Sequence, residues 1–206
     1  NKADFRIFDF CFNFDFFREN PKGIEVGGSI PLGVRLFQAR VQLLSHVQAI
    51  PDLDPEKTIG TGLADGLHKE VKTMNKENFI VRMHLEAVEH YQNRKHWERL
   101  TANDQAVLNE KIAGLPCPEP TDDIESRIFD LTVLKMQVAY AEGDMKNLEK
   151  HRKQVVDIAA LLEEKSSIPI VKKQLAYLAA LQAAGFWEDI TLAMLEDMRL
   201  RLRGLV

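Results

Sequence analysis

Hydrophobic residues recur at spacings of three and four along most of this chain, a pattern typical of helices that bury one face. One run predicts a helix that ends at about Ala49, before Pro51; it comprises Val34, Phe37, Val41, Leu44 and Val47. A second run continues to Tyr140 and comprises Ile124, Ile128, Leu131, Leu134 and Val138. Because short turns separate such runs, we expect an all-α fold, a multi-helix bundle of antiparallel helix pairs.

Between and after these runs the periodicity predicts further helices over 63–74, 79–93 and 101–114, the last with Ala106, Leu108 and Ile112 facing inward. Asp122 and Glu125 have the spacing of a capping box, and Gly143-Asp144 separates two helices. Ser-Ile-Pro at 29–31 and at 167–169 marks two helix starts. Gly185 is expected to stop the second of these helices, Phe186-Trp187 to form a packing turn, and 191–203 to form the last helix. No repeat of fixed period is evident between the regions.

The first twenty residues depart from this pattern. Aromatic residues alternate with Asp, Cys and Asn from Phe8 to Phe16, which favours a short strand-like segment over residues 5–10. Seven of the 11 phenylalanines gather here and are candidates for interdomain packing: Phe5, Phe8, Phe10, Phe12, Phe14, Phe16 and Phe17. So much aromatic surface indicates a partner that covers it.

Composition narrows the class of protein. The 206 residues carry 27 Lys and Arg against 31 Asp and Glu, a net charge of −4, which excludes a polybasic arm. The two cysteines cannot build a disulfide framework, which favours a cytoplasmic location. The longest uncharged stretch, the 14 residues from Gln174 to Trp187, is too short to cross a membrane.

The sequence contains no convincing catalytic site. Gly28 and Gly33 have the spacing of a phosphate-binding loop, but Val34-Arg35 stand where that loop needs Lys and Ser or Thr. The glycines at 60, 62 and 66 are mis-spaced for a dinucleotide-binding fingerprint. Asp52, Glu70 and Lys72 have the order found in magnesium-dependent nucleases, but that chemistry needs Glu and Lys on one strand, whereas a helix is predicted here. His84, His90 and His96 are six residues apart, which on one helix turns them away from each other and disfavours a metal site.

Two modest basic clusters are candidates for phosphate contacts. The first comprises Arg94, Lys95 and Arg99 around Trp97, whose indole could offer a flat contact, and the second comprises Arg199 and Arg203 on one helix face. In both clusters acidic neighbours dilute the charge, so an ordinary solvated surface is the alternative.

The Phe-rich start resembles the junction after the second helicase lobe in restriction (R, or HsdR) subunits of type I restriction-modification enzymes, through 5-FRIFDFC-11 and 13-NFDFF-17. The likeness continues through 78-NFIVR-82, 128-IFDL-131 and 168-IPIVKKQL-175, and then through 186-FWED-189 to the end of the chain.

The resemblance implies that residues 1–20 are the exit segment from a missing helicase lobe. Residues 21–206 would be a C-terminal helical domain with subregions at about 21–115 and 121–206, on either side of the linker 115-LPCPEP-120. In that family the parent subunit is a magnesium-dependent nuclease that hydrolyses ATP to translocate DNA. No catalytic or cofactor-binding residue of the family can be carried over to this chain.

The resemblance therefore implies a non-catalytic assembly domain. Its partners would be the methyltransferase and specificity subunits and the helicase lobe of the same chain, with double-stranded DNA as a further candidate and no membrane. Two alternatives stay open: a magnesium nuclease using Asp52, Glu70 and Lys72, and a free-standing helical protein–protein adaptor.

Overall fold

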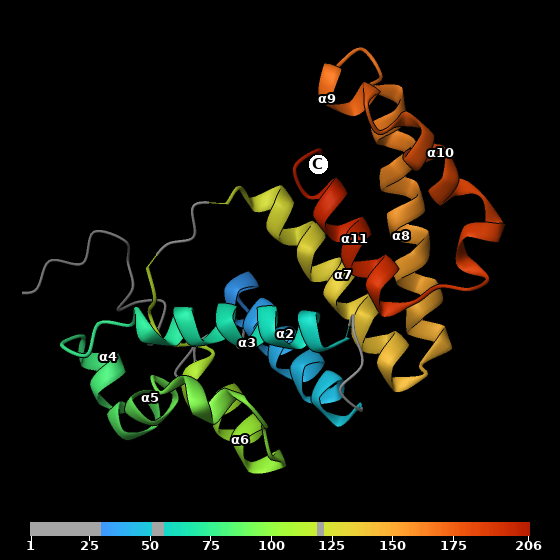
Figure 1. Cartoon of the computed structure of the whole chain (residues 1–206). Coiled ribbons are helices and arrows are strands. Elements are labelled where there is room, and N and C mark those ends of the chain that lie inside the picture. Colours follow the sequence, from blue (N-terminus) through green and yellow to red (C-terminus); the bar gives the residue numbers. More distant parts are fainter. Residues whose placement is uncertain (1–29, 51–55, 119–121) are drawn as a thin grey trace, which may run out of the picture. The chain divides into compact units, whose positions relative to one another are not determined.

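The computed structural model describes residues 30–50, 56–118 and 122–206, and in these residues all regular structure is helical (Figure 1). This confirms the prediction of an all-α fold for that part of the chain. The Phe-rich segment and its seven phenylalanines lie outside the described residues. The chain divides into two compact units, and the helices of the described residues belong to the second, Pro31–Val206.

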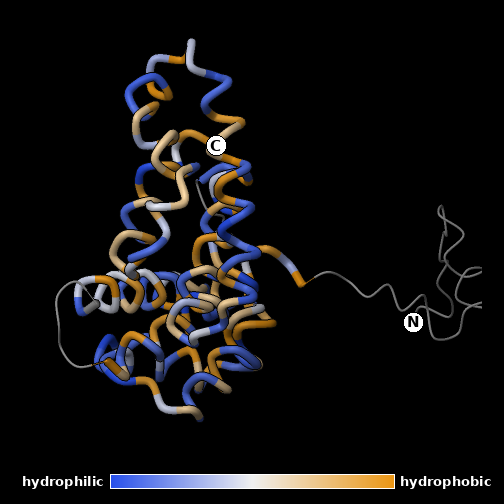
Figure 2. The backbone as a smooth tube through the Cα atoms, turned by 90° about the vertical axis from the view of Figure 1, so that its right-hand side faces the viewer, coloured by the Kyte–Doolittle hydropathy of each residue, from blue (hydrophilic) through white to orange (hydrophobic). Residues whose placement is uncertain are grey.

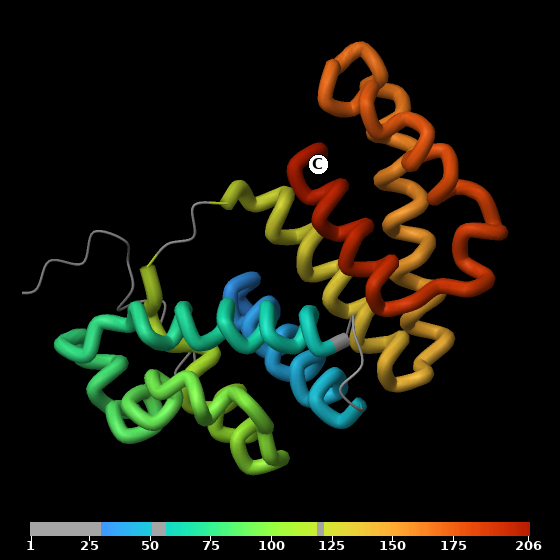
Figure 3. The backbone as a smooth tube through the Cα atoms, in the orientation of Figure 1, coloured from blue at the N-terminus to red at the C-terminus, as the bar shows by residue number. Residues whose placement is uncertain are grey.

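The helices of the second unit form two consecutive halves, coloured blue to green and then yellow to red in Figure 3. The first half contains α2 (Leu32–Ala49), α3 (Glu56–Lys72), α4 (Phe79–Arg82), α5 (Leu85–Tyr91), the 3-10 turn η1 (Arg94–Trp97), α6 (Ala102–Val107) and the π-helical η2 (Leu108–Ile112). The second half contains α7 (Ile124–Glu142), α8 (Met145–Glu164), α9 (Pro169–Lys172), α10 (Leu175–Gln182), the 3-10 turn η3 (Ala184–Trp187) and α11 (Leu192–Leu202).

The two halves are built on the same plan. α4, α5, η1 and α6 begin at residues 79, 85, 94 and 102, and α9, α10, η3 and α11 begin at 169, 175, 184 and 192, so each pair is 90 residues apart. Two long helices precede the four elements in each half. The expectation that the chain has no repeat of fixed period was therefore wrong, because the shared positions are few and scattered while the shared backbone is continuous.

The 3-10 turn shows the repeat most clearly. The indole Nε1 of Trp97 donates to the carbonyl of Tyr91 at 2.8 Å, and that of Trp187 donates to the carbonyl of Leu181 at 2.8 Å. Thr101 and Thr191 then cap the helices that follow, each accepting a backbone amide on its hydroxyl. The same side-chain devices thus close both turns.

Each half has its own hydrophobic core, and a third cluster lies between the halves. Phe37, Val41 and Leu44 of α2 face the core of the first half. Leu36, Ala39, Leu43 and Val47, on the other side of α2, pack against Leu131, Leu134 and Val138 of α7 and Leu192 of α11. Figure 2 shows the hydrophobic and hydrophilic positions mixed along these helices. We call this third cluster the seam.

The seam explains which inward positions the sequence pattern predicted wrongly. Ile124 and Ile128 of α7 are 59% and 51% exposed, whereas Phe129, Val133 and Met136 are buried in the core of the second half. Ala106 is also exposed, on α6, which has no buried residue and takes no part in the seam. A helix that buries two faces does not show the single stripe that a periodicity search assumes.

Most helix boundaries were predicted within a few residues, with four differences. α3 begins at Glu56, seven residues before the predicted start at residue 63, because the glycines at 60 and 62 are helical instead of breaking the helix. The helix expected over 79–93 is broken into α4 and α5 at Met83-His84, and α10 ends before Gly185, which lies inside η3. The residue that caps α7 is Asp123, whose carboxylate accepts the amide of Ser126, rather than Asp122. Gly143 (φ 69°) ends α7 and Asp144 caps α8, as the sequence predicted.

Across the described ranges, none of the helices is both long enough and apolar enough to span a lipid bilayer.

Candidate functional site

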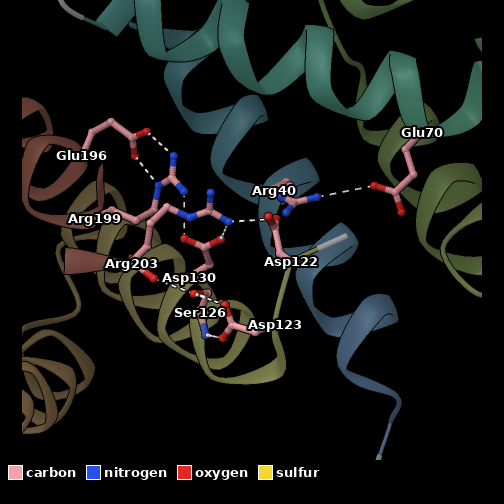
Figure 4. A network of polar contacts seen from close by, with 9 residues as sticks. All are labelled: Arg40, Glu70, Asp122, Asp123, Ser126, Asp130, Glu196, Arg199 and Arg203. Carbon is pink, nitrogen blue, oxygen red and sulfur yellow. Dashed lines mark hydrogen bonds and ion pairs between the residues drawn. The ribbon is translucent and has the colours of Figure 1, made fainter. Parts of the chain in front are cut away.

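The two predicted basic clusters occupy different environments in the folded chain. Arg199 and Arg203 lie on α11 and point toward α7, where they enter a network of ion pairs (Figure 4). Arg94, Lys95 and Arg99 lie in and beside η1, at the surface of the first half.

Asp130 of α7 is the centre of the network on α11. Its side chain is only 4% exposed, and each of its carboxylate oxygens accepts one arginine: Oδ1 from Arg199 Nη1 at 2.8 Å and Oδ2 from Arg203 Nη2 at 3.1 Å. Glu196 accepts two further hydrogen bonds from Arg199, at 2.6 and 2.9 Å. The two guanidinium partners offset the cost of burying this side chain, because both of its oxygens are paired.

The network continues to the two ends of the contact between α7 and α11. At one end Arg203 Nη2 pairs with Asp122 at 2.9 Å, and the Ser126 hydroxyl donates to the carbonyl of Arg203. At the other end Gln137 Nε2 donates to Glu196 at 3.0 Å. The network therefore fastens α11 to α7 along its length.

The electrostatics of this network favour a structural role for its arginines. Burial alone would lower the pKa of Arg199, but the hydrogen bonds and charges of Glu196 and Asp130 raise it above its usual value. Two arginines face three carboxylates, those of Asp122, Asp130 and Glu196, so the local charge is not positive. A phosphate group would have to compete with these carboxylates for the guanidinium groups.

A surface hollow of about 430 Å³ lies beside this network, between α2 and α3 of the first half and α7 and α11 of the second. Arg40, Asp130 and Arg199 line it together with Gly62 and Gly66 of α3. Nothing lies within 4 Å of a Cβ built at either glycine, so this wall of the hollow is open backbone.

The residues of the nuclease alternative do not have the strand geometry that magnesium-dependent nuclease chemistry needs. Glu70 and Lys72 both lie in α3, where residues two apart point to different sides. Glu70 pairs with Arg40 at 3.4 Å and lies 3.8 Å from the Cys117 thiol, and its burial raises its pKa. Asp52 lies outside the described residues. The helical placement of Glu70 and Lys72 argues against magnesium nuclease chemistry at this pair.

Cys117 is the free cysteine of the described segments and is exposed. Desolvation and then the negative charge of Glu70 raise the pKa of its thiol. Less of the thiolate is therefore present at neutral pH than in an isolated cysteine, which disfavours a nucleophilic role.

The segment from Asn93 to Arg99, which we call the basic turn, is held by three side chains. Asn93 accepts the amide of Lys95 at 3.1 Å. Gln48 of α2 donates to the carbonyl of Trp97 and accepts the amide of Leu100, both at 2.8 Å. Trp97 itself is fully buried, so its indole is not the flat surface contact that the sequence had suggested.

The cations of the basic turn face solvent. Arg94 uses its Nε to pair with Asp65 of α3 at 2.6 Å, with both side chains partly exposed. Lys95 and Arg99 are exposed, and no described residue pairs with either side chain. Arg94 and Arg99 also line a surface hollow of about 470 Å³, together with Lys57 and Thr61. This is the part of the described surface where the predicted phosphate-binding residues remain accessible.

The structure brings two of the three candidate histidines together. Because the chain leaves α5 before η1, the rings of His90 and His96 lie with their centroids 3.7 Å apart and their planes at 36° to each other. On a single helix, residues six apart would instead turn away from each other. Among the described residues no group of three or more metal-ligating side chains is arranged to hold a metal ion.

Comparison with known proteins identified no matching protein-family model, no matching curated protein and no matching solved structure. The internal repeat was missed in the sequence, although it left a signal: Trp-Glu pairs at 97–98 and 187–188, each followed by a threonine three residues after the glutamate. The seam left no such signal, because its residues come from three separate helices.

Proposed function

We propose that this chain is the C-terminal helical region of the R subunit of a type I restriction-modification enzyme. In this proposal it is a non-catalytic assembly domain that docks the motor and nuclease subunit onto the methyltransferase core. The partners are then the methyltransferase and specificity subunits and the preceding helicase lobe, all in the cytoplasm. ATP and magnesium serve the parent subunit, and no catalytic residue is assigned here.

The positions of the family-like motifs support the proposal. Asn78 caps α4 in the 78-NFIVR-82 motif, the 168-IPIVKKQL-175 motif covers α9, and Phe186-Trp187-Glu188-Asp189 covers the end of η3. The first two of these motifs thus fall at equivalent places in the two halves, at the start of the short helices α4 and α9.

One observation carries the assembly role: an apolar tip on α4, formed by Phe79, Ile80 and Met83. These side chains are 77%, 46% and 61% exposed. Leaving a phenylalanine and a methionine in water on one short helix is unfavourable unless a partner covers them. In the second half Ile168 and Ile170 are exposed at the equivalent place, by 43% and 55%. Such a surface is typical of a protein-binding module and has no use in nuclease chemistry.

The decisive experiment measures binding of the 206-residue chain to a purified complex of the methyltransferase and specificity subunits from the same genome. We expect a stable complex by size-exclusion chromatography. Replacing Phe79 and Met83 together by Asp should weaken it at least about tenfold, because buried aromatic anchors dominate interface energies.

A matched control replaces two exposed apolar residues away from the tip, Ile128→Asp with Leu161→Asp, both more than half exposed. This control should bind as the unchanged chain does. No complex with the unchanged chain, or equal loss in both double variants, would count against the proposal. The reading frame upstream of Asn1 distinguishes the proposal from the alternative of a free-standing adaptor. It encodes helicase motifs if the proposal holds and none if the chain is such an adaptor.

A further inference from the structure

The internal repeat allows one turn to be compared with its own counterpart. In the first half the positions 94, 95, 96 and 99 are Arg, Lys, His and Arg, and in the second half the positions 184, 185, 186 and 189 are Ala, Gly, Phe and Asp. Both turns also contain a glutamate. Residues 94–99 therefore carry three cations and one acid, whereas residues 184–189 carry two acids and no cation. The two turns share a backbone but differ by four units of charge.

The fold does not need the cations of the basic turn. Two of the residues that build the turn are the same in both halves: a tryptophan that donates to the carbonyl six residues earlier, and a threonine that caps the next helix. The second half forms this turn with Ala184 and Gly185 where the first half has Arg94 and Lys95. The positive charge of the first turn therefore has a cause other than folding.

The surface hollows beside the two turns differ in the same way. The first hollow, of about 470 Å³, is lined by the cations Lys57, Arg94 and Arg99, with Glu98 as its acidic residue. The second, of about 260 Å³, is lined by Glu149 and Glu188 with Arg152, among apolar side chains. Counted over these lining residues, the first hollow has more cations than acids and the second more acids than cations, so the first is the more favourable for an anion.

We propose that the basic turn binds the phosphate backbone of duplex DNA through Lys95 and Arg99, with Arg94 beside them. This inference rests on the proposed function, because membership of a DNA-translocating enzyme is what identifies the anion as DNA. Arg199 and Arg203, the other predicted phosphate contacts, hold α11 on α7 instead. The turn is a rigid support for such contacts because Gln48 fixes it to α2 at both Trp97 and Leu100.

The chemistry of the turn favours duplex DNA over other polyanions. Single-stranded nucleic acid is bound by stacking bases on exposed aromatic rings. Of the two aromatic rings in residues 94–99, that of Trp97 is fully buried and that of His96 lies against the His90 ring, with centroids 3.7 Å apart. Interfaces with acidic proteins have an apolar centre, whereas the exposed residues of the turn, Asn93, Lys95, Glu98 and Arg99, are all polar. Contacts to backbone phosphates need only accessible cations.

The test measures binding of the 206-residue chain to a fluorescein-labelled duplex by fluorescence anisotropy over a range of KCl concentrations. The variant Lys95→Ala with Arg99→Ala changes two exposed residues. It should weaken binding roughly tenfold at low salt and reduce the slope of log affinity against log salt by about 2, since each lost phosphate contact removes about one released ion. Circular dichroism should show an unchanged fold.

The control variant, Lys172→Ala with Lys173→Ala, removes the same charge from exposed positions at the end of α9. It should leave the slope unchanged. Equal loss of duplex binding in both variants overturns the inference, because net charge alone would then explain binding. The inference is also overturned if the Lys95→Ala, Arg99→Ala variant loses binding to a poly-glutamate peptide but keeps binding to the duplex. The Phe79→Asp, Met83→Asp variant should keep full DNA binding, so failure of the assembly proposal is seen separately.

Discussion

Asp130 shows how one residue determines the role of two others. Its carboxylate is 4% exposed and lies between Arg199 and Arg203. Arginines that look available for phosphate in the sequence are therefore committed to a partner 69 and 73 residues away. At this scale, a cation is a candidate ligand-binding residue only when no buried carboxylate holds it.

Replacing Asp130 by Asn should lower the free energy of unfolding by about 3 kcal/mol. The amide keeps the size of the side chain but leaves two arginines without their shared anion in a partly desolvated site. Urea unfolding followed by circular dichroism measures the change.

Asp197→Asn is the matched control, because Asp197 is 50% exposed and pairs with Arg201 on the surface of α11. This change should cost less than about 1 kcal/mol. Similar losses in the two variants would show that the Asp130 network does not fasten the helix.

At the scale of an element, α6 depends on its first turn. Thr101 and Asp104 form a reciprocal capping box, and the Tyr91 hydroxyl of α5 donates to Asp104 at 2.7 Å. The helix is only six residues long before it continues as η2, so few backbone hydrogen bonds stabilise it otherwise. Its start is therefore fixed by side chains.

Asp104→Ala should lower the free energy of unfolding by about 1 kcal/mol at neutral pH, the usual cost of a lost cap. Burial alone would raise the pKa of Asp104, but hydrogen bonds from Thr101 and Tyr91 outweigh it and hold the pKa below its ordinary value of 3.8. A lowered pKa means that the carboxylate stabilises the fold fully above that ordinary value and progressively less as the pH falls below it.

The difference in the free energy of unfolding between Asp104→Ala and the unchanged chain should therefore become smaller as the pH falls below 3.8. Thermal unfolding between pH 7 and pH 3 measures it. Glu110→Ala, an exposed acid in η2, serves as the control and should show less than about 0.5 kcal/mol at every pH. A constant difference for Asp104→Ala would contradict the charged cap.

At the scale of the whole unit, the seam joins the two repeated halves into one folded body. α2 and α7 each contribute one face to the core of their own half and another face to the seam. Neither half can therefore unfold without exposing apolar residues of the other. We expect the unit Pro31–Val206 to unfold in one cooperative transition.

Leu43→Ala tests this coupling, because Leu43 is fully buried in the seam. The change should cost about 2–5 kcal/mol. Trp97 reports on the first half and Trp187 on the second, so variants with a single tryptophan give a fluorescence signal for each half. Both signals should shift to lower urea by the same amount, whereas a shift confined to the Trp97 signal would contradict a shared seam. Leu161→Ala, on the exposed side of α8, should shift neither signal.

The sequence by itself determined the helical class and most helix ends, because spacing, capping residues and glycines act within a few positions of the backbone. Gly143 and Asp144 illustrate this local control. It also indicated which cations were candidates for phosphate. Only the tertiary structure decided which of these cations are ion-paired and which are accessible: Asp130 pairs with Arg199 and Arg203, while Lys95 and Arg99 stay exposed. Burial and ion pairing depend on residues far away in the chain. The seam depends on such residues too, and Ile124 and Ile128 of α7 are exposed to solvent although their spacing had predicted burial.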